Sequence, residues 1–189
     1  GTSLGIDSGK ECPYFTCPMT DRFAPFDQQI DPDRALSILR GATAGAEDGE
    51  IFLERIRGEN LAFDDGRLRN AGFEAAQGFG LRAVRGEVTG YGHSTDISEA
   101  SLREAAAMAR LAVGNGGGTL AAAPAGPGAR LYRGEDPVEG IGFGARIATL
   151  RDIDSFARDL DPRVVQVTAS MASSLQEVVI LRPEGGIFT

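Results

Sequence analysis

The chain has one histidine, two cysteines and no tryptophan among its 189 residues. A zinc site built from cysteine and histidine needs four such ligands, so His93 has too few partners to form one. We expect His93 to lie at the surface or to support other residues. Cys12 and Cys17 are the only cysteines, and their sequence is compatible with either a disulfide or half of a metal site.

The sequence also lacks long apolar runs and a basic face. No segment approaches the roughly 20 apolar residues of a membrane helix, and none has the apolar core of a secretory signal. The net charge of −8 argues against nucleic-acid binding, which needs basic residues to neutralise phosphates. No Lys-Ser/Thr pair follows the glycines at 116–118, so residues 115–128 indicate a surface linker rather than a phosphate-binding loop.

Residues 1–18 show no periodic pattern, and Met19 would be a natural first residue of the protein. We interpret residues 1–18 as an irregular tag or an over-extended gene start. Residues 19–189 then form one domain without cysteine, which fits the reducing cytoplasm. Their share of hydrophobic and charged residues (42% and 24% for the whole chain) is typical of a globular protein.

The patterns that are present predict an α+β fold, a mainly antiparallel sheet with two or three helices packed on one face. Asp65-Gly66 is a strong hairpin signal, and residues 58–60 are predicted to turn or bulge the preceding strand. Residues 187–189 begin a strand whose partners we expect in a domain beyond Thr189. Strands are expected at 50–57, 61–63, 67–77, 78–84, 88–91, 164–170 and 176–181.

Three helices are predicted from capping and apolar spacing. Asp31 is expected to cap the first, with Pro32 at its first position, and Asp96 to cap the second, with Glu99 completing a capping box. An alanine-rich stripe marks the second helix for close packing on a sheet. The expected buried faces are Ala35, Leu36, Ile38, Leu39 and Ala42; Leu102, Ala105, Ala106, Ala109 and Val113; and, over 146–160, Leu150, Ile153, Ala157 and Leu160.

The glycine-rich hairpin at 78–91 is the most unusual segment. Its glycines either permit twisted, bulged backbone or let another backbone approach closely. The candidate peptide-approach residues are Gly78, Gly80, Arg82 and Gly90, although an arginine on the polar side of a hairpin commonly forms only solvated ion pairs. Asp64-Asp65 is interpreted as a turn rather than as a pair of acid–base carboxylates.

This hairpin closely resembles part of the N-terminal domain of the TldD/PmbA family of zinc metallopeptidases. The chain looks more like TldD than PmbA (TldE), and the resemblance extends over roughly residues 33–189. Each motif is weak alone, but their order and spacing support the family. The segments that carry the resemblance are 51–63, 78–84, 86–91, 105–110, 161–170 and 178–181.

The resemblance implies a cytoplasmic protein that cleaves flexible peptides and forms a homodimer or a heterodimer with a TldE/PmbA-like subunit. The family's zinc site, a His-Glu-x-x-x-His motif with a distant cysteine, does not occur in this sequence. We expect it in a later domain, so no catalytic, cofactor or metal residue is assigned, and the chain alone should be inactive. It would form a wall of the peptide-access route and part of the dimer surface.

The alternative is a non-catalytic binding or regulatory module, in line with the family's older description as modulators of DNA gyrase. The acidic charge disfavours direct DNA contact.

Overall fold

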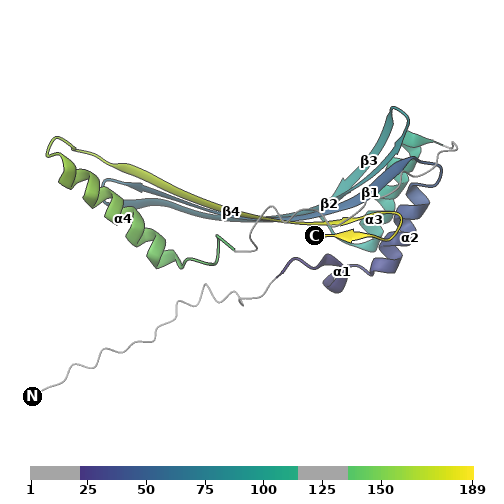
Figure 1. The fold of residues 1–189 in the computed structure, drawn as a ribbon, viewed down its shortest axis with the longest axis horizontal. Helices are drawn as coiled ribbons and strands as arrows, with labels where there is room; N and C mark the ends of the chain where they lie inside the picture. The colour runs from purple at the N-terminus through teal and green to yellow at the C-terminus, as the bar shows by residue number, and fades with distance from the viewer. Residues whose placement is uncertain (1–21, 115–135) are drawn as a thin grey trace, which may run out of the picture.

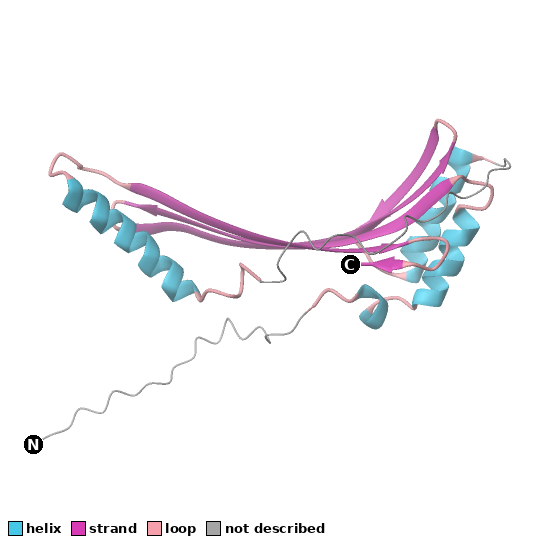
Figure 2. Cartoon of the chain, in the orientation of Figure 1, coloured by secondary structure: helices cyan, strands magenta, loops and turns pink. Residues whose placement is uncertain are grey.

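The computed structural model describes residues 22–114 and 136–189. Their fold is a five-stranded antiparallel sheet in the order β3-β2-β1-β4-β5, with helices at its two ends (Figure 1, Figure 2). This confirms the predicted α+β class. Residues 1–18 and the predicted linker at 115–128 lie outside the described residues. The elements are α1 (Pro25–Gln28), α2 (Pro32–Ala42), β1 (Asp48–Asp64), β2 (Arg67–Arg85), β3 (Val88–Ser94), α3 (Glu99–Val113), α4 (Phe143–Leu160), β4 (Thr168–Leu181) and β5 (Ile187–Phe188).

The central strands are longer than the sequence pattern suggested. β1 and β2 pair continuously, so the break expected at 58–60 is wrong; the register shifts only between Ala62 and Phe63. The two strands meet at the predicted turn, where Asp65 and Gly66 have φ values of 49° and 73°. Glycine and short polar residues tolerate this left-handed conformation, which suits a two-residue hairpin.

The C-terminal part of the sheet differs from the prediction in two ways. Residues 164–167 are not in a strand, and the two strands expected at 164–170 and 176–181 are one continuous strand, β4. The strand begun by Ile187 and Phe188 pairs with Leu181 and Ile180 of β4, so its partner is within this chain. The expectation that its partner lies beyond Thr189 is therefore wrong.

Two separate apolar cores lie on the helix-bearing face of the sheet. The larger one joins α2 and α3 to residues such as Ile51, Leu53 and Leu81. The smaller one, at the opposite end, consists of Leu61, Phe63 and Leu150 with partly buried neighbours. Because alternate residues of a strand face the same side, the odd-numbered residues of β1 carry both cores. The long strands bridge them, as Figure 1 shows.

The helices near the larger core follow the predicted pattern closely. Asp31 caps α2 by accepting from the Arg34 backbone N–H at 2.9 Å, and the predicted stripe of α3 is buried. The cap of α3 is Ser98, not Asp96: its hydroxyl oxygen accepts from the Ser101 N–H, and the helix begins at Glu99. Asp96 instead accepts hydrogen bonds from the Ser98 and Ser101 hydroxyls at 2.6 and 2.7 Å.

These hydroxyls lower the pKa of Asp96 below its ordinary value of 3.8. A carboxyl group whose pKa is lowered by folding stabilises the folded state at pH values above its ordinary pKa. This stabilisation is lost as the pH falls through the pKa of the folded state. We expect the melting temperature of an Asp96→Ala variant to fall less than that of the wild type as the pH drops below about 4. Thermal melts across this window measure it. Asp159→Ala is the control, because the Asp159 carboxylate has no hydrogen bond or ion pair with another described residue, and its melting temperature should follow that of the wild type. If Asp159→Ala behaves like Asp96→Ala instead, the hydrogen bonds of Asp96 are not the cause of the pH dependence.

α4 is turned relative to the predicted face. Leu150 is buried as expected, but Ile153 and Leu160 are 45% and 69% exposed. The buried positions are Arg146, Leu150 and Asp154. Ion pairs of Arg146 with Glu59 and of Arg158 with Asp65 fix this rotation, because they draw the polar side of the helix toward the sheet.

Candidate functional site

The glycines of the β2–β3 hairpin lie against the chain's own backbone. A Cβ on Gly90 would lie 2.0 Å from the Ala109 carbonyl oxygen of α3, and one on Gly78 would lie 2.8 Å from the Ser94 carbonyl oxygen. The close approach predicted for these two positions is therefore made by α3 and by the start of the β3–α3 connection. A role of Gly78 and Gly90 in peptide approach stays a prediction.

Gly80 and Arg82 lie one strand from the edge, opposite β3. The Tyr91 ring lies over Gly80, where its hydroxyl would come within 2.3 Å of an added Cβ. Tyr91 stacks on His93 with ring centroids 5.7 Å apart, and both side chains are exposed. His93 thus lies at the surface, and it forms an aromatic pair beside the sheet.

Arg82 belongs to an ion-pair network across three strands. Its guanidinium contacts Asp48 at 2.7 Å and Glu50 at 3.2 Å. Arg182, from the end of β4, contacts the same two carboxylates at 3.0 and 3.1 Å. Both arginines are therefore paired with the same two carboxylates, and a peptide carboxylate at Arg82 would compete with both acidic partners. Arg82 thus forms ion pairs, which was the alternative to peptide contact for this residue.

A second network occupies the sheet between the two cores. We call this region the waist; it is centred on Arg55, Arg57 and Glu59 of β1 and on Glu177 of β4. Arg55 contacts Glu177 at 2.8 Å, and Arg57 lies 3.8 Å from the same carboxylate. The waist therefore has charged side chains where both ends of the sheet have apolar ones.

The waist also ties down the segment that precedes α4. Arg57 contacts Asp136 at 2.8 Å and Glu139 at 2.5 Å. Burial lowers the pKa of Arg57, but these carboxylates together with Glu177 raise it above its ordinary value. Arg146 of α4 pairs with Glu59. Sequence reasoning missed this network, because its members are separated by up to about 120 positions and no local pattern marks them.

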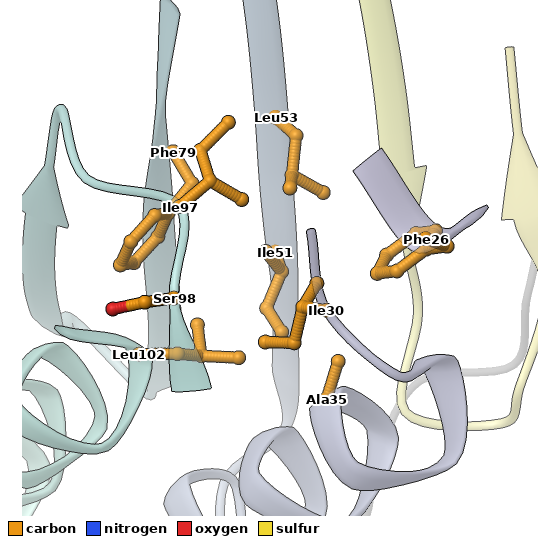
Figure 3. Close-up of a pocket in the computed structure, with 9 residues that line it drawn as sticks. All are labelled: Phe26, Ile30, Ala35, Ile51, Leu53, Phe79, Ile97, Ser98 and Leu102. Atoms are coloured by element: carbon orange, nitrogen blue, oxygen red, sulfur yellow. The ribbon is translucent and has the colours of Figure 1, made fainter. Parts of the chain in front are cut away.

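A small apolar cavity of about 10 Å³ lies beneath α1 and between α2, α3 and the sheet (Figure 3). Its walls include Phe26, Ile51, Phe79 and Leu102. Ligand pockets usually measure about 300–1,000 Å³, so this cavity has no room for a peptide or a cofactor. It is a packing gap in the larger core.

The described residues do not fit a zinc site. Within residues 22–114 and 136–189, no group of three or more histidine, cysteine, aspartate or glutamate side chains could hold a metal ion. Cys12 and Cys17 lie outside this part of the chain. The described helices are also all too short or too polar to span a lipid bilayer.

The sequence of this chain is similar to a known protein family and to individual members of it. Residues 49–113, from the start of β1 to the end of α3, match the family described as PmbA/TldA metallopeptidase domain 1. The chain belongs to the PmbA/TldD metallopeptidase family. The "Metalloprotease TldD homolog" of Haemophilus influenzae is 31% identical over 140 residues, which cover 72% of this chain and 29% of the relative. The homolog of the same name from Buchnera aphidicola is 26% identical over 161 residues, covering 83% and 33%.

Two solved structures share the fold of this chain. TldE from Thermococcus kodakarensis superposes with a TM-score of 0.58 at 15% identity and covers 82% of this chain and 36% of its own. A protein of Thermotoga maritima described as a putative modulator of a DNA gyrase also gives 0.58, at 16% identity and with 82% and 35% covered. The chain spans about a third of the length of the curated relatives it matches.

Proposed function

We propose that this chain is the non-metal-binding, N-terminal domain of a TldD-like zinc metallopeptidase that cleaves flexible peptides in the cytoplasm. The observation that supports it is the match of residues 49–113 to domain 1 of the family, combined with TldD homologues of which this chain covers only 29–33%. The described residues hold no metal-ligand cluster. In this proposal the catalytic site lies in another part of the longer protein.

In this proposal the domain forms a wall of the route by which a peptide reaches the metal. Gly78, Gly80 and Arg82 lie on the face of the sheet opposite the helices, because alternate residues of a strand face the same side, and the Ser94 carbonyl lies close to Gly78. This face is helix-free among the described elements (Figure 1). An extended peptide lying across such a sheet would be held mainly through its backbone, which tolerates many sequences.

The domain also takes part in a dimer, either with a second copy or with a TldE/PmbA-like subunit. The likeness to TldE supports a partner of the same fold. Zinc bound elsewhere in the protein would polarise the scissile carbonyl of the peptide and activate a water molecule. Residues of this chain would shape access and hold the assembly together.

A non-catalytic binding module is the second candidate, favoured by the structural neighbours described as putative modulators of DNA gyrase. Reading the gene beyond Thr189 separates the two. A His-Glu-x-x-x-His motif in the same reading frame is expected for the peptidase. A stop codon directly after Thr189 would reject the peptidase and support the module.

A further inference from the structure

The two long edges of the sheet differ in their protection. Among the described residues, β2 has no strand partner on its outer side over 67–78, and β4 has none over 168–179. The open part of β2 carries Arg67, Arg69 and Glu74. Charged residues on an edge discourage another chain from pairing with it. Residues 168–176 of β4 contain no charged residue and no proline.

The open groups of β4 can be assigned to particular residues. The Asp65 N–H donates to the Val167 carbonyl at 2.9 Å, so odd-numbered residues of this strand bond inward, toward β1. Successive residues of a strand bond to opposite sides. The N–H and C=O groups of residues 170, 172, 174 and 176 therefore point outward, and they form a complete ladder for one more strand.

An apolar stripe of α4 lies beside this edge. Arg158 of α4 points to Asp65 at the β1–β2 turn. Ile153, Phe156 and Leu160 lie about 140–160° around the helix from Arg158, by the 3.6-residue period. Because β2 and β4 flank β1 on opposite sides, the stripe lies on the β4 side of α4. Its members are 45%, 65% and 69% exposed.

We propose that the outer edge of β4 and the stripe of α4 together form a docking surface for a second copy of this chain. A two-fold axis beside Ala172, perpendicular to the sheet, would pair the two β4 strands antiparallel. It would also place the two α4 helices on the same face, stripe against stripe. Such an isologous contact brings each residue near its own equivalent. The uncharged edge of β4 can lie against its own copy without like-charge repulsion. The edge of β2 cannot, because its charged residues would lie near their own equivalents.

The inference rests on the dimerisation included in the proposed function and names its surface. A dimer formed in this way extends the antiparallel sheet across both copies and covers the exposed apolar residues of α4. A TldE-like subunit or an extended peptide at the same edge would be a different occupant, and the experiment treats either as contrary to the proposal.

Sedimentation equilibrium of the full 189-residue chain, across low to high micromolar concentrations, tests the surface. The wild type is expected to dimerise. Ala172→Lys with Ser174→Lys, which places four lysines near the two-fold axis, should raise the dimer dissociation constant by about 100-fold. Asn70→Lys with Ala76→Lys adds the same charge to the open part of β2 and should leave the dimer unchanged.

The stripe has its own matched pair of variants. Phe156→Ser with Leu160→Ser should weaken the dimer by at least tenfold, whereas Met108→Ser with Leu111→Ser, at exposed positions of α3, should not. Circular dichroism confirms that each variant is folded, and hydrogen exchange at residues 170, 172 and 174 should slow as the wild type associates. A wild type that stays monomeric, or a dimer that both β4-side variants leave intact, overturns the proposal. Chelator-sensitive peptide hydrolysis by the longer protein tests the proposed function separately.

Discussion

Replacing Gly90 with alanine is expected to lower the free energy of unfolding by about 3 kcal/mol or more, a large share of the 5–15 kcal/mol typical of a domain. The added Cβ would lie 2.0 Å from the Ala109 carbonyl oxygen. A backbone atom cannot rotate away as a side chain can, so α3 must shift off β3 and open the larger core. Urea unfolding followed by circular dichroism measures the loss.

Gly41→Ala provides the matched control. Gly41 lies in α2 with nothing within 4 Å of an added Cβ. Alanine costs less conformational entropy than glycine in a helix, so this variant should gain about 0.5–1 kcal/mol. Equal losses at Gly41 and Gly90 would show that the close packing of α3 on β3 is not what Gly90 supports.

The second large effect is expected at Arg146, which holds α4 against the waist. Its side chain is 3% exposed, pairs with Glu59 and donates to the backbone carbonyls of Pro137 and Val138. Arg146→Met leaves a largely buried carboxylate without its cation and should cost about 3–5 kcal/mol. Urea unfolding gives the loss, and hydrogen exchange should show α4 opening before α3.

Two further variants identify the cause. Arg146→Met with Glu59→Leu removes both charges and should cost less than Arg146→Met alone, because no buried charge stays unpaired. Arg103→Met, at an arginine that is 63% exposed and pairs with Glu99, should cost under about 1 kcal/mol. A double variant as unstable as the single one would mean that the packing of the arginine stem, not the ion pair, holds α4.

The parts of the fold predicted well are those governed by local pattern. The stripe of α3 from Leu102 to Val113 and the Asp65-Gly66 turn depend on residues close in sequence. The break expected near Gly58 was wrong because Gly58 is paired on both sides within a three-strand ladder. Cross-strand pairing outweighs the weak strand propensity of glycine there, and no single-strand pattern reveals it.

The face of α4 was misassigned for a related reason. Its apolar residues at helical spacing predicted the buried side, yet Arg146 and Asp154 are buried and Ile153 is not. Ion pairs with distant residues decided the rotation. The cap of α3 shows a smaller version of this effect, since Asp96 and Ser98 both suit a cap and only the backbone conformation distinguishes them.

The candidate site was predictable mainly through resemblance. The spacing of the hairpin glycines indicated a close backbone approach, and at Gly90 that approach is the chain's own helix. The waist gave no signal in the sequence, because Arg57, Glu139 and Glu177 meet only after β1, β4 and the segment before α4 are assembled. Peptide contact by Gly78, Gly80, Arg82 and Gly90 stays a prediction.

The central claim is that this domain belongs to a metal-dependent peptidase but carries none of its catalytic groups. The direct measurement is hydrolysis of an unstructured peptide by the full-length product of the gene, with zinc and with a chelator, beside the 189-residue chain alone. We predict chelator-sensitive cleavage by the full-length protein and none by the chain, which should also hold no stoichiometric zinc. Cleavage by the chain itself, or a full-length protein without metal-dependent peptidase activity, would contradict the account.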